Sequence, residues 1–195
     1  MYHLEIEPTL AHQQTMNEIE RFTVDTVDAI WQLVRAGRYT QALVIIYSAI
    51  DTLAWASLSS GDVTRHDFCR WVNRYIRPES ELGCTADDLY AARCALVHSG
   101  SAESRMSREG QATEIWYATS PHSVHLVQTH AQQTKSAAKV LYFTNIVSAF
   151  VEAATRFSDE ISGDIERLQS VNERIRRWLR FVPASSMQTE GSEKS

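Results

Sequence analysis

Several motifs that reveal common enzyme classes are absent from this sequence. It contains no glycine-rich phosphate loop, no GxSxG nucleophile elbow and no HExxH pair. These motifs bind phosphate, expose a serine or hold a zinc ion, so their absence leaves the common hydrolase and kinase classes without support.

Cysteine, long apolar runs and excess positive charge are also scarce. The three cysteines, Cys69, Cys84 and Cys94, have no CxxC spacing, and their odd number leaves one unpaired, so we expect a reduced, cytoplasmic protein. The most apolar stretch, residues 42–50, is too short to cross a bilayer, and the first seven residues do not resemble a signal peptide. The net charge of -5 argues against a general nucleic-acid coat but allows a local basic groove.

Apolar residues recur at helical spacing through the first half of the chain. They predict an amphipathic helix from Met16 to Val34 and an almost wholly apolar helix from Tyr39 to Leu58. Only a short segment around Gly37 and Arg38 separates the two, so we expect an antiparallel hairpin. A basic helix is predicted over residues 64–76.

The second half predicts a β-hairpin and long helices. After a serine- and glycine-rich loop at 99–110, segments 114–118 and 124–127 flank a turn and predict two paired strands. Helical spacing then runs from residue 140 to 157 and from 161 to 182, as one helix or as two.

Together these elements predict a mainly α protein. We expect a helical bundle of about five to six helices with a small inserted β-hairpin. It forms a single domain over residues 1–183, and residues 184–195 form a disordered tail.

One predicted helix carries an arginine on its apolar side. It should begin at Thr85, with Asp88 as capping-box partner, and end near Gly100. Four residues share one face: Leu89, Arg93, Leu96 and Val97. A buried arginine needs a carboxylate or an anion, because an unpaired interior charge costs several kcal/mol.

His98 follows Arg93 by five positions and completes an R-x4-H element. A histidine can move a proton near neutral pH, and an arginine can hold a phosphate and offset developing charge. Asp51, on the apolar helix, could orient Arg93 through a charged hydrogen bond. Because residues five apart on an ideal α-helix point about 140° apart, His98 needs a frayed helix end or a partner chain to reach the same phosphate.

The segment Arg93-Cys94-Ala95-Leu96-Val97-His98, with Asp51 on the preceding helix, resembles the HEPN family of helical ribonuclease and nucleotide-binding domains. The resemblance extends from Met16 to about Val182, but only the short motif is specific. It implies a homodimer in which two such elements face each other across a composite cleft. It also implies RNA cleavage without metal, in which the substrate's own 2′-hydroxyl attacks and leaves a 2′,3′-cyclic phosphate.

Two positions differ from the family pattern. Cys94 stands where catalytic members often have a polar residue, and a small core residue explains it better than a nucleophile. Gly100 stands where members paired with nucleotidyltransferase antitoxins often have a tyrosine, so a switch based on that tyrosine is not expected.

The motif residues also have purely structural explanations. Asp51 and Arg93 can form a buried ion pair that locks two helices, and His98 can cap a helix C-terminus.

Four further arginines are candidates for RNA and phosphate binding. Arg105 and Arg108 lie in the loop after the motif, while Arg70 and Arg74 lie on the basic helix beside aromatic residues that could stack bases. The alternative for the basic helix is an ordinary solvated face.

Histidine and cysteine spacing predicts no metal site. His122 and His125 would point to opposite faces of a strand, and with His130 they match no zinc pattern. His66 and Cys69 would supply at most two ligands. We expect neither a metal nor another cofactor.

Three hypotheses about function remain. The first is a HEPN-like, metal-independent endoribonuclease of a toxin–antitoxin or defence system, with Arg93 and His98 as catalytic residues and Asp51 in support. Its expected partners are RNA or a nucleotide, a second copy of the chain, and an antitoxin or other protein encoded beside it. The second is a non-catalytic HEPN-like module that binds nucleotide or RNA or regulates a partner. The third is a purely structural helical bundle, in which all the polar residues discussed above only stabilise the fold.

Overall fold

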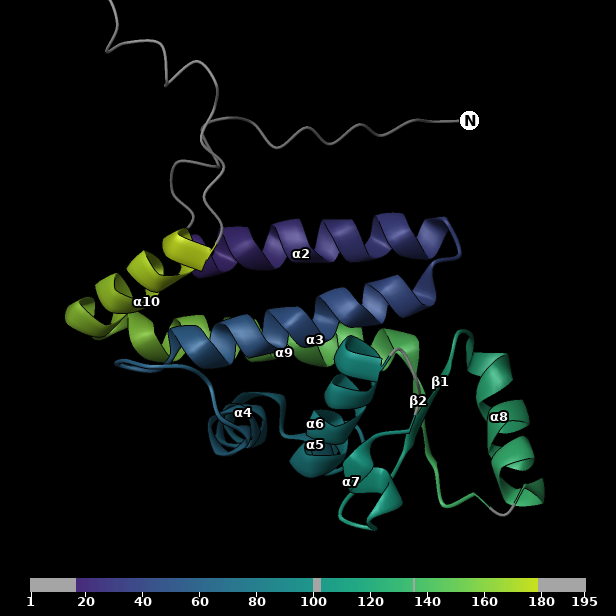
Figure 1. Ribbon diagram of the computed structural model, residues 1–195. Helices are drawn as coiled ribbons and strands as arrows, with labels where there is room; N and C mark the ends of the chain where they lie inside the picture. Colours follow the sequence, from purple (N-terminus) through teal and green to yellow (C-terminus); the bar gives the residue numbers. More distant parts are fainter. Residues whose placement is uncertain (1–16, 100–102, 135, 179–195) are drawn as a thin grey trace, which may run out of the picture.

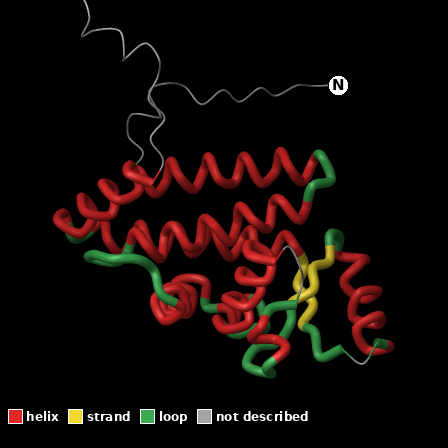
Figure 2. The backbone as a smooth tube through the Cα atoms, in the orientation of Figure 1, coloured by secondary structure: helices red, strands yellow, loops and turns green. Residues whose placement is uncertain are grey.

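The computed structural model describes residues 17–99, 103–134 and 136–178, except for the side chains of residues 98, 99 and 178. It confirms the mainly α class (Figures 1 and 2). Nine α-helices lie within these residues, more than the five to six predicted, together with two short π-helical segments. The predicted tail at 184–195 and the terminator Gly100 lie outside the described residues.

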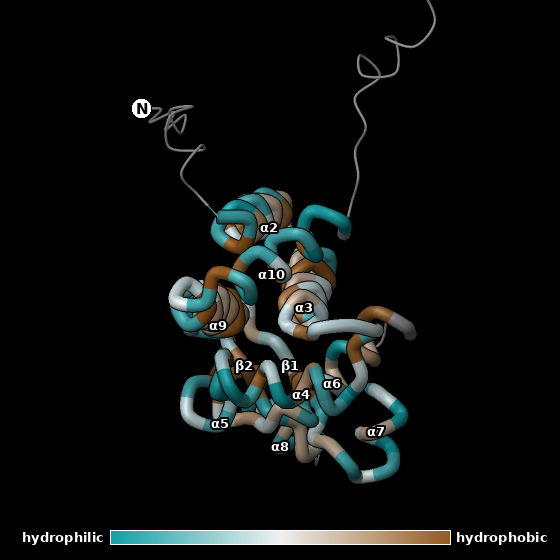
Figure 3. The backbone as a smooth tube through the Cα atoms, turned by 90° about the vertical axis from the view of Figure 1, so that its left-hand side faces the viewer, coloured by the Kyte–Doolittle hydropathy of each residue, from teal (hydrophilic) through white to brown (hydrophobic). Residues whose placement is uncertain are grey.

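Four long helices form the main bundle. They are α2 (Glu18–Arg35), α3 (Tyr39–Ala56), α9 (Phe143–Ser162) and α10 (Ile165–Trp178). Viewed nearly end-on, α2 lies above α3 and α9, and α10 packs against all three (Figure 3). Among the described residues, no helix has both the length and the apolarity to cross a membrane.

The α2–α3 hairpin forms as predicted, and its boundaries follow from local chemistry. Asn17 and Glu20 form a capping box at the start of α2. Gly37 lies in the connection with a φ of 71°, a conformation that glycine adopts without a steric penalty. Helix α3 is buried around most of its circumference and packs against both α2 and α9.

Smaller elements cover one side of this bundle. They are α4 (Arg65–Trp71), the π-helical segment η1 (Val72–Ile76), α5 (Pro78–Glu81), α6 (Ala86–Cys94) and the π-helical segment η2 (Ala95–Ser99). The predicted basic helix therefore changes from α-helical to π-helical geometry at Val72. The predicted capping box between Thr85 and Asp88 is present at the start of α6.

The predicted β-hairpin is wrong. The two strands, β1 (Ile115–Ala118) and β2 (Lys139–Tyr142), are parallel, and α8 (Pro121–Gln133) connects them. Residues 124–127, predicted as the second strand, lie inside α8. Ser120 caps this helix and Pro121 fills its first position, which together start a helix where we expected a turn.

The remaining differences concern helix ends. The loop predicted at 99–110 contains a one-turn helix, α7 (Arg105–Arg108), capped by Ser104. The helix predicted from residue 140 begins at Phe143, because the preceding residues pair in β2. Helices α9 and α10 are separate, with Gly163 and Asp164 between them.

Candidate functional site

Arg93 and Asp51 lie together, as the sequence predicts. Arg93 on α6 donates from Nε to Asp51 Oδ2 on α3 at 2.6 Å, and its Nη2 lies 2.6 Å from the same oxygen. Both side chains are largely buried, with exposed fractions of 19% and 18%. The pair therefore joins α6 to the central helix of the bundle.

Burial and ion pairing shift the pKa of Arg93 in opposite directions. Burial disfavours the charged guanidinium, but the adjacent Asp51 carboxylate outweighs it and raises the pKa of Arg93 above its usual value. Arg93 is consequently a fixed cation with restricted orientation, which suits it to hold a phosphate.

Two neighbours of Arg93 complete a four-residue cluster, which we call the Arg93 cluster: Asp51, Tyr90, Arg93 and Cys94. Arg93 Nη1 lies 3.9 Å from Cys94 Sγ, and Tyr90 precedes Arg93 by one helical turn on α6. Tyr90 is not among the site residues predicted from the sequence. Its position three residues before Arg93 and four before Cys94 places it on the same helical face, and that spacing could have identified it.

The backbone changes geometry immediately after this cluster. Helix α6 ends at Cys94 and continues as the π-helical segment η2, which contains position 98. A π-helix has i→i+5 hydrogen bonds and is frequent at functional sites, so the 140° separation expected for positions 93 and 98 on a regular α-helix does not apply here. The side chain of His98 itself lies outside the described residues. Val97, predicted on the apolar face, is 39% exposed.

The four arginines predicted to bind RNA are exposed and engaged with carboxylates. The pairs are Arg70–Asp67, Arg74–Glu160, Arg105–Glu109 and Arg108–Glu103. The four arginines lie on α4, η1 and α7 and not on α6 with Arg93. Exposed ion pairs contribute little stability, so each arginine can exchange its partner at low cost.

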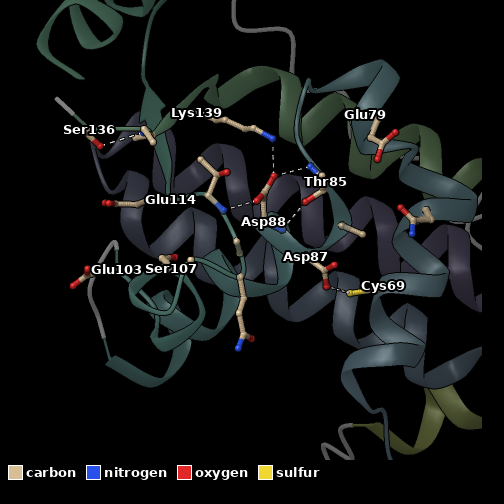
Figure 4. A pocket seen from close by; sticks show the side chains of 18 residues that line it. Cys69, Glu79, Thr85, Asp87, Asp88, Glu103, Ser107, Glu114, Ser136 and Lys139 are labelled. Carbon is tan, nitrogen blue, oxygen red and sulfur yellow. Dashed lines mark hydrogen bonds and ion pairs between the residues drawn. The ribbon is translucent and has the colours of Figure 1, made fainter. Parts of the chain in front are cut away.

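A separate hollow of about 700 Å³ lies beside the start of α6 (Figure 4). Residues 110–114 and 136–139 form much of its wall, and it contains none of the predicted catalytic or phosphate-binding residues. Its lining includes five carboxylates and one ammonium group: Glu79, Asp87, Asp88, Glu103, Glu114 and Lys139. This excess of negative charge would repel a phosphate, so RNA is not expected there.

Asp88 links three of the segments that line the hollow. Its carboxylate accepts hydrogen bonds from the backbone of Thr85 at 2.8 Å, the backbone of Thr113 at 2.6 Å and the ammonium of Lys139 at 2.8 Å. Burial alone would raise the pKa of Asp88, but the Lys139 and backbone hydrogen bonds outweigh it and hold the pKa below its usual value. Asp88 thus joins α6, the segment before β1 and the start of β2.

No three residues of the metal-binding types come together within the described part of the chain. His122, His125 and His130 are exposed on α8, which corrects the placement of His122 and His125 on a strand. The His130 ring lies 5.7 Å from that of Trp116, so this histidine has an aromatic contact.

Comparisons with known proteins leave the family open. No family model, no curated protein and no solved structure matches this chain. The resemblance to HEPN domains therefore depends on the R-x4-H element and Asp51 alone.

Proposed function

We propose that this protein is a HEPN-like, metal-independent endoribonuclease. In this proposal Arg93 binds the scissile phosphate, His98 transfers protons, and Asp51 holds Arg93 in place. The 2′-hydroxyl of the substrate attacks the adjacent phosphorus, the bond to the 5′-oxygen breaks, and a 2′,3′-cyclic phosphate and a 5′-hydroxyl result. His98 and its counterpart in a second copy serve as general base and general acid.

The observation that supports this proposal is the position of the Arg93–Asp51 pair. A largely buried guanidinium, aligned by a carboxylate at 2.6 Å, lies one residue before the end of α6, which continues as the π-helical segment that contains position 98. A bundle that needed only stability would gain as much from well-packed apolar residues at both positions 51 and 93, because replacing both partners of a buried ion pair in this way is often neutral or stabilising.

The arrangement also offers a side from which a phosphate can approach. Asp51 engages the Nε–Nη2 edge of Arg93, while Nη1 faces the thiol of Cys94 at 3.9 Å. A thiol is a weak hydrogen-bond acceptor, so a phosphate oxygen can replace it with a net gain. We place the scissile phosphate on this side of the guanidinium.

The first test is cleavage of RNA by the purified protein in EDTA. The wild type should release products with 2′,3′-cyclic phosphate ends, and both His98→Ala and Arg93→Ala should lower the rate at least about 100-fold. His122→Ala is the matched control, because it removes an exposed histidine on α8. Full activity in His98→Ala or Arg93→Ala, with thermal unfolding unchanged, would contradict the assignment.

A second function, a non-catalytic module that binds RNA or nucleotide, is favoured by two observations. Cys94 is a thiol beside the arginine where catalytic relatives carry a polar group, and all four exposed candidate arginines have carboxylate partners. This function predicts salt-sensitive RNA binding without cleavage. The partners in either case, a second copy and a protein encoded nearby, belong to the proposal.

A further inference from the structure

The partly exposed residues of α3 form one stripe along the helix. Within residues 46–56 every residue is buried except Ser48, Asp51 and Trp55. Their spacing of three and four positions places them on one face of the helix. Arg93 pairs with Asp51 from α6, and Arg174 lies over Trp55 from α10. In Figure 3, α10 lies above α3 and α6 below it, so two arginines from different helices reach one stripe.

Arg174 is held in place without a carboxylate partner. Its guanidinium carbon lies 4.1 Å from the centre of the Trp55 ring, and its Nη2 donates to the carbonyl of Gly61 at 3.1 Å. It forms no ion pair within the described part of the chain, and its buried Nε has no hydrogen-bond partner there. The four arginines predicted to bind RNA, in contrast, all pair with carboxylates. Arg174 is therefore the better placed to receive an anion.

The charges around Arg174 also favour an anion. Burial, and next the nearby Arg177, lower the pKa of Arg174, while Asp62 attracts it from beyond ion-pair distance. Arg177 is 67% exposed and lies 3.6 Å from Glu173, which makes a weak surface pair. Because an arginine stays charged at neutral pH, a phosphate at Arg174 would gain a charge-assisted hydrogen bond and offset the repulsion from Arg177.

The two cations of the stripe lie a short distance apart. Asp51 and Trp55, which hold them, are four residues apart, or about 6 Å along α3. Successive phosphates of a nucleic-acid strand have a similar separation. An RNA strand can therefore lie along the stripe with one phosphate at each guanidinium, whereas a mononucleotide would reach only one of them.

We propose that Arg174 is a substrate-binding residue that holds the phosphate of a neighbouring nucleotide while Arg93 holds the scissile phosphate. Trp55 is a positioning residue, because its ring supports the guanidinium in one plane. The substrate is then an RNA strand of at least three nucleotides. This inference rests on the proposed function, in which Arg93 marks the site of cleavage.

The test compares Arg174→Gln with the wild type in binding a short oligoribonucleotide whose 2′-hydroxyls are methylated to block cleavage. Each phosphate is replaced in turn by a neutral methylphosphonate. Arg174→Gln should raise the Kd of the unmodified strand about 10-fold, and one replacement that raises Kd in the wild type should have no effect in the variant. The slope of log Kd against log salt concentration should fall by about 0.7, the value for one phosphate contact of a single strand.

Cleavage kinetics and matched variants separate a substrate contact from a packing effect. Arg174→Gln should raise KM and change kcat by less than about 3-fold, because the contact lies away from the reacting atoms. Arg176→Gln is the control, since Arg176 lies on the same helix but pairs with Glu18 of α2 at 3.0 Å, and it should leave KM and Kd unchanged. Trp55→Leu should raise Kd about 3-fold, Trp55→Phe should restore it, and neither should raise Kd further in Arg174→Gln.

The outcomes are distinguishable. Binding of RNA by the wild type with an unaltered Kd in Arg174→Gln overturns the role of Arg174 and leaves the proposed function standing. A raised Kd that still responds to every methylphosphonate as the wild type does also overturns it, because the effect would then be transmitted through packing. A wild type that neither cleaves nor binds RNA overturns the proposed function, and the Arg174 inference with it.

Discussion

Replacement of Asp88 by asparagine removes one negative charge from the hollow while it keeps the size of the side chain. Asp88 is 2% exposed and accepts three hydrogen bonds, two at Oδ2 and one at Oδ1. The amide oxygen of asparagine can replace Oδ1 and accept from the backbone of Thr113. Its NH₂ group would then face two donors, the backbone of Thr85 and the ammonium of Lys139.

The expected loss of stability follows from these contacts. A hydrogen bond to a charged group contributes about 1.5–3 kcal/mol, and two such bonds are lost at Oδ2. Lys139 is 34% exposed and can turn toward water, which recovers part of the loss. We therefore expect Asp88→Asn to lower the free energy of unfolding by about 2–4 kcal/mol at pH 7.

The pH dependence gives an independent check. Because the pKa of Asp88 is lowered in the folded state, its contribution is present above the unfolded pKa of about 3.9 and is lost as the pH falls through the folded value. The difference between the wild type and Asp88→Asn should therefore be largest near pH 7 and shrink below about pH 4.

Urea unfolding, followed by tryptophan fluorescence, measures the loss of unfolding free energy at pH 7 and the change of that loss with pH. The control is Asp87→Asn, an adjacent carboxylate that is 48% exposed and pairs with Arg65, which should cost less than about 1 kcal/mol. A loss below 1 kcal/mol for Asp88→Asn at pH 7, or a difference that stays constant down to pH 3, would refute this account of the hollow.

Three shorter predictions follow from other contacts. Arg77→Gly should raise the free energy of unfolding in urea by about 0.5–1 kcal/mol, because Arg77 is held at a φ of 56° that costs an L-residue about 1–2 kcal/mol. Cys69 and Cys84 should react with iodoacetamide only in denaturant, as mass spectrometry can show, because burial raises the pKa of each thiol to about 12. Asp51→Asn and Arg93→Met should each lower the melting temperature, and the double variant should lose less than the sum, as a double-mutant cycle measures.

The sequence predicts local features of this fold well. The α2–α3 hairpin, the capping box of Thr85 and Asp88 and the pairing of Arg93 with Asp51 all depend on short spacings or on a charge that needs a partner. Such features are decided by residues a few positions apart, or by the high cost of an unpaired buried charge.

Features that depend on distant residues could not be predicted in the same way. Lys139 follows Asp88 by 51 positions, and no local pattern indicates that the two meet. The strand at 114–118 is predicted and corresponds to β1, but its parallel partner β2 is not, because the residues of β2 continue directly into the helical pattern of α9. The π-helical geometry of η1 and η2 has no signal in residue spacing, since it arises from an extra residue accommodated within the packed helix.

The βαβ unit at 115–142 divides into a firmly held strand and a loosely held helix. Strand β1 is joined to the core by a hydrogen bond between the hydroxyls of Tyr117 and Tyr47, whereas Ala131 is the sole buried residue of α8. Helix α8 can therefore unfold locally while β1 stays in place. Insertions or substitutions in this helix should therefore disturb the Arg93 cluster little, because so few of its side chains are anchored in the core.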